Sequence, residues 1–141
     1  AAGPAALPAS DAGASLADLR GRAAGVPLQL IHLVPTLKPR PAEDVVTMRE
    51  HFIWLRTHEM AARLMSCGPV EPDAPLAPGI WGGGMGVAAV SRETAQAMAA
   101  AEPSGLMGYR TLRVEPWRMD YGLAAPIARA LTTLDGLMPV A

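Results

Sequence analysis

The sequence predicts a single α+β domain of the ferredoxin-like βαββαβ class, with a four-stranded antiparallel sheet. Three observations lead to this class. An apolar segment at 26–34 precedes the longest helical pattern in the chain, two strand-like segments then flank a run of glycines, and a short helix leads into an alternating segment at 109–117. With 141 residues, half of them hydrophobic, the chain is long enough to bury the core of one domain.

The first strand is predicted at 26–34, where a nearly continuous apolar run indicates that both faces are covered. Residues 1–25 are rich in Ala, Gly and Pro and lack the basic and apolar regions of a signal peptide, so we interpret them as a flexible arm with a short helix near 15–22. The domain itself is predicted at 26–119. Residues 120–141 are predicted as a C-terminal helical tail, with its helix at 121–137.

A long helix is predicted at 41–66, because this stretch contains no glycine or proline after Pro41. At about 100° per residue, one face of this helix collects a mostly apolar set with two histidines: Met48, His51, Trp54, Leu55, His58, Ala62 and Met65. A second apolar stripe contains Val46, Ile53, Met60 and Leu64. A helix with two apolar stripes needs two partners, its own sheet and either the C-terminal helix or another subunit.

The remaining elements follow in the order that the class requires. A strand or turn is predicted at 67–70, a proline-rich loop at 71–79, a strand at 85–90 and a helix at 92–101 with Ser91 as its N-cap. The last strand is predicted at 109–117, where side chains alternate between two faces. One face is polar, and the other carries Arg110, Leu112 and Val114. Both helices then lie on one face of the sheet. The bare face predicts a homodimer, in which a second copy covers it.

Composition excludes several classes of function. A net charge of −1 argues against a nucleic-acid partner, which would favour a basic excess. No apolar run approaches the roughly 18 residues of a membrane span, so no membrane partner is expected. The single cysteine, Cys67, cannot form an internal disulfide, and we expect a cytoplasmic protein.

Two stretches of the chain carry a resemblance to a known family. The first is Glu50-His51-Phe52-Ile53-Trp54-Leu55 followed by Cys67-Gly68-Pro69-Val70, and the second runs from Ser91-Arg92-Glu93-Thr94-Ala95-Gln96-Ala97 through Glu102-Pro103 and Gly108 to Val114-Glu115-Pro116-Trp117. Over residues 28–117 the ordered set resembles the YCII-related family. That resemblance implies a dimeric α+β barrel and, in characterised members, small lyase-type enzymes of aromatic-ring breakdown. It also implies a polar pair between the helix histidine and the acid of an Asp-Pro step, here His51 and Glu102, with Glu in place of Asp.

His51 and Glu102 are the candidate catalytic residues. A carboxylate beside an imidazole fixes the tautomer of the ring and suits proton transfer near pH 7. The alternative for this pair is a partly buried core histidine and an exposed acid at a helix end. Both readings stay open at the level of the residues alone.

Six further residues are candidates for substrate binding: His32, Trp54, His58, Trp81, Met85 and Tyr109. We expect a cavity between the long helix and the sheet, lined by Trp54, His58, Met85 and Tyr109, with Trp81 as a lid or a dimer contact. His32 enters the cavity or hydrogen-bonds within the core. No zinc-type ligand spacing is present, and the glycines at 82–86 lack the order of a phosphate-binding loop, so neither a metal nor a cofactor is expected. Cys67, placed at a helix end, is expected to be inert.

These observations predict a cofactor-free enzyme acting on a small molecule. It would catalyse an acid–base elimination, isomerisation or cyclisation of an apolar cyclic or enolisable substrate, in a biosynthetic pathway. A non-catalytic dimeric ligand-binding or accessory protein is the first alternative, and a cofactor-free monooxygenase on the same fold is the second.

Overall fold

The computed structural model describes residues 11–135 and contains one four-stranded sheet with the order β2-β3-β1-β4, in which all neighbours are antiparallel. The predicted α+β class and the βαββαβ order are therefore confirmed. Three short helices are added to that order: one before β1, one between α3 and β4, and one after β4. The elements are α1 (Leu16–Gly21), β1 (Val26–Pro35), α2 (Thr47–Met60), β2 (Leu64–Pro69), β3 (Gly84–Ala88), α3 (Arg92–Ala100), α4 (Pro103–Leu106), β4 (Arg110–Met119) and α5 (Ala125–Thr132).

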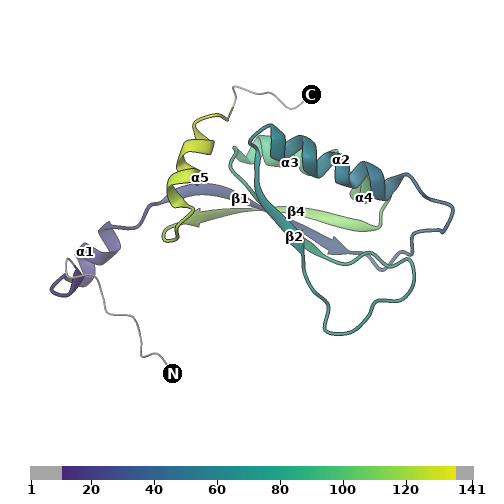
Figure 1. Ribbon diagram of the computed structural model, residues 1–141, viewed down its shortest axis with the longest axis horizontal. Helices are drawn as coiled ribbons and strands as arrows, with labels where there is room; N and C mark the ends of the chain where they lie inside the picture. Colours follow the sequence, from purple (N-terminus) through teal and green to yellow (C-terminus); the bar gives the residue numbers. More distant parts are fainter. Residues whose placement is uncertain (1–10, 136–141) are drawn as a thin grey trace.

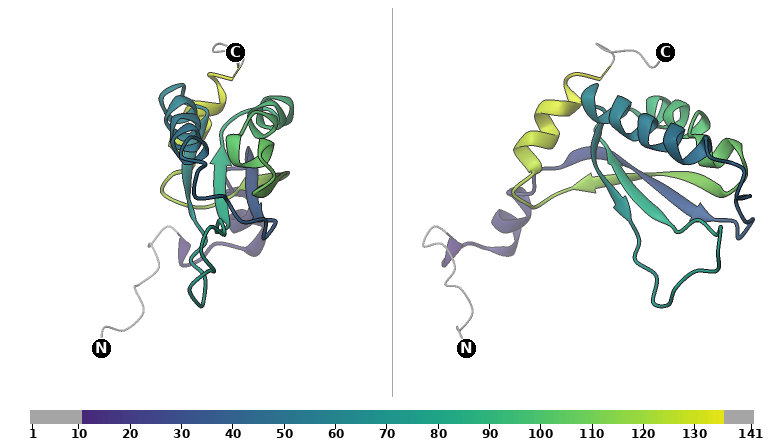
Figure 2. Two further views of the ribbon diagram at one scale, coloured as in Figure 1. Left: turned by 90° about the vertical axis from the view of Figure 1, so that its right-hand side faces the viewer. Right: turned by 45° about the vertical axis from the view of Figure 1, so that its right-hand side comes forward.

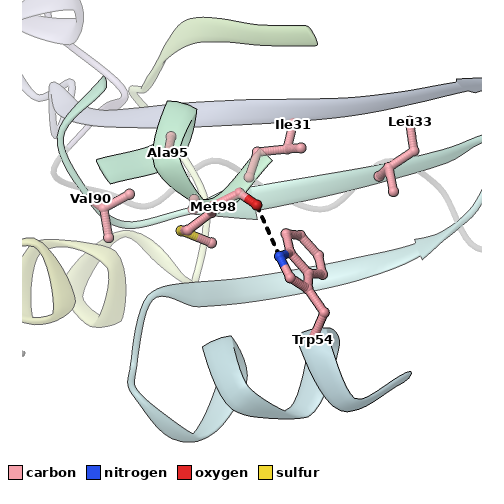
Figure 3. Packing of buried hydrophobic residues seen from close by; sticks show 7 residues of the cluster. Ile31, Leu33, Trp54, Val90, Ala95 and Met98 are labelled. Carbon is pink, nitrogen blue, oxygen red and sulfur yellow. Dashed lines mark hydrogen bonds between the residues drawn. The ribbon is translucent and has the colours of Figure 1, made fainter. Parts of the chain in front are cut away.

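Helices α2 and α3 lie side by side over one face of the sheet (Figures 1 and 2). Between them and the sheet is the main core, in which the side chains of Ile31, Leu33, Trp54, Ala95 and Met98 are buried (Figure 3). The indole Nε1 of Trp54 donates a hydrogen bond of 2.9 Å to the backbone carbonyl of Met98. Because Trp54 belongs to α2 and Met98 to α3, this bond fixes the two helices against each other.

The long helix is shorter at both ends than the predicted range of 41–66. At its start, the carboxylate of Asp44 accepts the backbone N–H groups of Val46 and Thr47 and the hydroxyl of Thr47, so the helix begins only after this cap. At its end, Ala62 has a left-handed backbone with φ 59°, which stops the helix without a glycine. Residues up to 46 are thus a loop, and Leu64 already belongs to β2.

The two terminal helices differ in how they attach. Helix α1 forms within the predicted range of 15–22, where Ser15 and Asp18 make a reciprocal capping box, and none of its residues is buried. Helix α5 is shorter than the predicted 121–137, of which the last two residues lie outside the described range. It packs through Ala125 and Ala128 against β1.

The face of the sheet opposite α2 and α3 is only partly covered. Because side chains alternate along a strand, Val26 and Leu28 point away from the side that carries Ile31 and Leu33, and α5 covers them. Elsewhere on this face, within residues 11–135, Val34 near the end of β1 is 45% exposed, and Trp117, the register partner of Leu28, is 41% exposed. The second copy that was expected to cover this face stays a prediction.

Candidate active site

A cavity of about 560 Å³ opens at the end of the sheet, beside the N-terminal half of α2. Helix α2 contributes Met48, His51, Phe52 and Leu55 to its wall. The sheet contributes Leu33, Cys67, Gly84 and Arg110. The segment that joins β2 to β3 closes another side with residues 70–72 and 79–83, among them Trp81. The wall is thus mostly apolar, and its histidine and charged side chains are His51, Arg40, Glu71 and Arg110.

His51 and Glu102, 51 positions apart, meet in the fold. His51 lies in the second turn of α2, Glu102 is the N-cap of α4, and the distance from the imidazole Nδ1 to the carboxylate Oε1 is 2.7 Å. Both residues are buried, and Glu102 is fully so. The longer side chain of Glu, compared with Asp, spans from the start of α4 to the ring on α2.

Glu102 is held as an anion despite its burial. Burial by itself raises the pKa of a carboxyl group, but the hydrogen bonds from His51, from the Ser104 hydroxyl and from the backbone N–H of Gly105 outweigh it and lower the pKa of Glu102 to about 2. An ionised carboxylate can only accept, so Nδ1 of His51 carries the proton that is shared with it. The lone pair of the imidazole is then on Nε2. His51 lines the cavity, whereas Glu102 does not.

Arg110, the first residue of β4, completes a buried polar cluster with His51, Glu102 and Ser104. Its Nε donates to the Ser104 hydroxyl at 2.7 Å, and its Nη2 lies 3.6 Å from Oε1 of Glu102. The same Nη2 is 3.1 Å from Nδ1 and 3.4 Å from Nε2 of His51. A nitrogen so close to both ring nitrogens must lie over the face of the imidazole, because an approach in the ring plane would overlap Cε1.

The guanidinium of Arg110 also contacts an aromatic ring of the cavity wall. Its central carbon is 4.8 Å from the centroid of the Trp81 ring, a cation–π contact. Burial lowers the pKa of Arg110 and the charge of Glu102 opposes this, so the side chain remains a cation at neutral pH. The sequence analysis did not name Arg110 as a site residue. The available signal was its position, because a charged residue on the apolar side of a strand needs a buried partner.

Of the six residues expected to bind substrate, Trp81 lines the cavity and Tyr109 supports it. The rings of Trp81 and Tyr109 stack with centroids 6.0 Å apart, and Trp81 meets His51 edge-on at 5.5 Å. The Tyr109 hydroxyl donates to Asp44 at 2.7 Å, which raises the pKa of Tyr109. Tyr109 therefore ties Trp81 to the cap of α2 and does not itself form the wall.

The other four candidates lie outside this cavity wall, which corrects the expected lining. Trp54 is buried in the core, where its Nε1 donates to the carbonyl of Met98. Nδ1 of His58 accepts a hydrogen bond of 3.0 Å from Nε of Arg63. Burial, assisted by the charge of Arg63, lowers the pKa of His58 to about 4, so this ring is neutral at pH 7. His32 and Met85 are register partners, and alternation places them on the face of the sheet away from α2, where His32 lies 3.3 Å from Glu115.

Cys67 lies in β2 and not at a helix end, because α2 stops at Met60. Partial burial raises the pKa of its thiol, more than the nearby Arg110 lowers it. The group is therefore a neutral thiol in the cavity wall. Within residues 11–135, no three His, Cys, Asp or Glu side chains lie close enough together to hold a metal ion. No helix in the same range is long and apolar enough to cross a membrane.

Comparisons with known proteins give a distant likeness to a solved structure. No family model matches the chain, and no curated protein matches it. Among solved structures, it is similar to the 5-chloro-2-hydroxyhydroquinone dehydrochlorinase of Burkholderia phenoliruptrix AC1100, determined in complex with 2,5-dihydroxybenzoquinone. The two chains are 20% identical, with a TM-score of 0.45, and the match covers 64% of this chain and 92% of that one.

Proposed function

We propose that this protein is a cofactor-free enzyme that moves a proton on a small, largely apolar, cyclic or enolisable molecule, with His51 as the general base. The observation that carries the proposal is the 2.7 Å bond between Nδ1 of His51 and a buried, ionised Glu102, made by a ring that lines a cavity. A carboxylate in this position orients the imidazole and stabilises the imidazolium that forms when Nε2 takes a proton. The cavity volume also falls within the usual range for small-molecule sites, about 300–1,000 Å³.

In the proposed reaction, Nε2 of His51 removes a proton from a carbon next to a carbonyl group. The electron pair of the broken C–H bond forms a C=C bond, and the carbonyl π pair moves to its oxygen, which gives an enolate. In an elimination, the enolate re-forms the carbonyl and expels a leaving group from the β-carbon. In an isomerisation, the imidazolium returns the proton to a different carbon. Neither route needs an electron acceptor or a metal.

The test is hydrogen exchange on defined probes. In D₂O, the wild-type protein is expected to exchange the α-protons of a cyclic β-diketone or of cyclohexanone, followed by NMR, and to release chloride from a β-chlorocyclohexanone. His51→Gln should lose at least about 100-fold in these rates, the usual scale of general acid–base catalysis. His58→Gln is the matched control, since it replaces the same residue type on the same helix outside the cavity. Probes that bind without exchange, or an unchanged rate in His51→Gln, would contradict the proposal and favour a ligand-binding protein.

We further propose that the working form is a homodimer formed through the partly covered face of the sheet. Support comes from exposed Trp117, which lies one diagonal step from the half-buried Leu30, the register partner of Val87, and from exposed Val34 toward the other end of that face. An exposed apolar patch on a small domain is typically an interaction site. A symmetric pair of identical faces would bury it on both copies at once.

A further inference from the structure

The guanidinium of Arg110 has hydrogen-bonding capacity that the buried cluster does not use. Arginine carries five N–H donors. Of the nitrogens of Arg110, Nε bonds Ser104, and Nη2 faces His51 and Glu102. For Nη1, no hydrogen-bond partner is found among residues 11–135, and this atom is not among the buried polar atoms that lack a partner. Nη1 therefore keeps some exposed surface, although Arg110 as a whole is buried.

The accessible end of Arg110 belongs to the cavity of His51. Arg110 borders a second hollow as well, but that one is lined by residues of α3, α4 and β4, such as Ala99 and Leu112, and by neither aromatic partner of the guanidinium. The guanidinium itself lies against the rings of His51 and Trp81, both of which line the first cavity. His51 and the guanidinium of Arg110 thus lie together on one side of the cavity.

Glu102 balances the charge of Arg110 without occupying its donors. Oε1 of Glu102 is bonded to His51 at 2.7 Å and lies farther, at 3.6 Å, from Nη2 of Arg110. Oε2 is bonded to the Ser104 hydroxyl and to the N–H of Gly105. The carboxylate is therefore close enough to keep a buried cation stable, while the free N–H groups of the guanidinium can bind another oxygen.

We infer that Arg110 binds an anionic oxygen of the ligand, so that the substrate class is a flat apolar molecule with a carboxylate, a phenolate or a carbonyl that becomes an enolate. The inference rests on the proposed function, because the enolate oxygen lies two bonds from the α-carbon whose proton His51 takes. A donor aimed at the place where negative charge develops lowers the barrier of such a step. The apolar walls, Leu33, Phe52 and Leu55 among them, hold the remainder of the molecule.

The first experiment measures binding of benzoate and of its neutral counterpart benzamide by titration calorimetry. Wild-type protein should bind benzoate more tightly than benzamide. Arg110→Gln should weaken benzoate binding about tenfold or more, the scale of one charged hydrogen bond, and leave benzamide unchanged. Arg118→Gln is the matched control, because Arg118 is an exposed arginine of the same strand, paired with Asp120 and outside the cavity.

Two additions keep the test decisive if Arg110→Gln folds poorly. Arg110→Lys keeps the positive charge beside Glu102 and loses the planar fork, so it should fold and bind benzoate with intermediate affinity. With para-nitrophenol, the wild-type protein should raise the phenolate absorbance at a pH below the pKa of the free phenol, and Arg110→Lys should raise it less. Benzoate binding alone identifies a carboxylate subsite, whereas a phenolate signal identifies a site for developing charge.

The outcomes separate this inference from the proposed function. If benzoate affinity is the same in the wild type, Arg110→Gln and Arg110→Lys, or if the wild type binds neither benzoate nor the phenolate, the role of Arg110 is refuted. In that case His51→Gln can still abolish proton exchange, and the enzyme proposal stands. If Arg110 controls anion binding but no probe is deprotonated, the anion site stands and the enzyme proposal fails.

Discussion

Two histidines of α2, His51 and His58, are separated by two turns of helix and are both buried on the same side. His51 meets an anion, the carboxylate of Glu102, at its Nδ1. His58 meets a cation at the same atom, because Nε of Arg63 donates to it, and its other neighbour is the ring of Trp54 at 4.9 Å. Arg110 also lies 3.1 Å from the His51 ring, but there the Glu102 carboxylate offsets its charge. No carboxylate is bonded to His58, and burial, assisted by the charge of Arg63, lowers the pKa of His58 to about 4. A buried carboxylate partner and a place on the cavity wall, both of which His58 lacks, separate the candidate base from the structural histidine.

The largest expected effect is on turnover. Replacing His51 with Gln should reduce proton transfer on the exchange probes by about 10²- to 10⁴-fold, because the proposed base is lost. His58→Gln should stay within about threefold, because its ring does not line the cavity. Steady-state rates of the two variants, on the probe that wild-type protein turns over fastest, measure the difference. Equal losses in both would mean that the two histidines are not distinct in function.

The next effect is on stability and concerns the anion beside His51. Glu102→Ala removes a fully buried carboxylate and leaves Arg110 buried without its counter-charge, so the free energy of unfolding should fall by about 3 kcal/mol or more. Glu115→Ala removes a half-exposed acid of β4 and should change it by less than about 1 kcal/mol. Urea unfolding of both variants is the measurement. A small effect of Glu102→Ala would show that the cluster does not depend on this charge.

The third effect is the pH dependence of stability. The pKa of His58 is about 4 in the folded protein, below its ordinary 6.5, so between these values the unfolded chain binds more protons. Stability must then fall as the pH drops from 6.5 to 4, by at most roughly 3 kcal/mol if this histidine acts alone. The pKa of Glu102 is lowered from 4.5 to about 2, so the stability that its ionised form contributes is lost in a lower window, from 4.5 down to 2.

Unfolding midpoints at a series of pH values distinguish these two windows. His58→Gln should flatten the curve between pH 6.5 and 4 and leave the acid limb unchanged. Glu102→Gln should flatten only the acid limb. If His58→Gln leaves the slope above pH 4 as it is in the wild type, its ring is not held neutral by its surroundings.

The smallest expected effect is on the oligomeric state and concerns the partly covered face of the sheet. Trp117→Lys places a charge at an exposed apolar position far along β4 from Arg110, so it should weaken the proposed dimer and change monomer stability by less than about 1 kcal/mol. Sedimentation velocity of wild type and variant measures the oligomeric state. A wild-type protein that stays monomeric at high concentration would refute the dimer. The contacts of His51 and His58 would be unaffected, because they are made within one chain.

Local pattern was sufficient for much of the fold. The apolar run at 26–34, the cap at Ser91 and the alternation after Tyr109 each correspond to an observed element. The ends of α2 were not predictable in the same way, since they depend on the Asp44 cap and on the left-handed backbone of Ala62. Neither feature has a strong sequence signal, because most alanines adopt right-handed backbone and most aspartates cap nothing.

The candidate site, too, was predicted only in part. The pairing of His51 with Glu102 was anticipated from the resemblance to a family, and the structure brings these residues together. Arg110 and the actual cavity wall were not anticipated. Helical spacing alone placed Trp54 and His58 beside His51, but a helix face is shared between a core and a cavity, and spacing cannot say where one gives way to the other.

By itself, the sequence determined the order of strands and helices, the buried face of α2 and the absence of a second cysteine, because these depend on residue type and local periodicity. Only the tertiary structure decided which histidine meets a carboxylate, that an arginine lies over its ring, and which apolar side chains line an open cavity. These contacts join residues about 50 or more positions apart. Their distances are set by how α2, α4 and β4 pack together, and no local pattern encodes that packing.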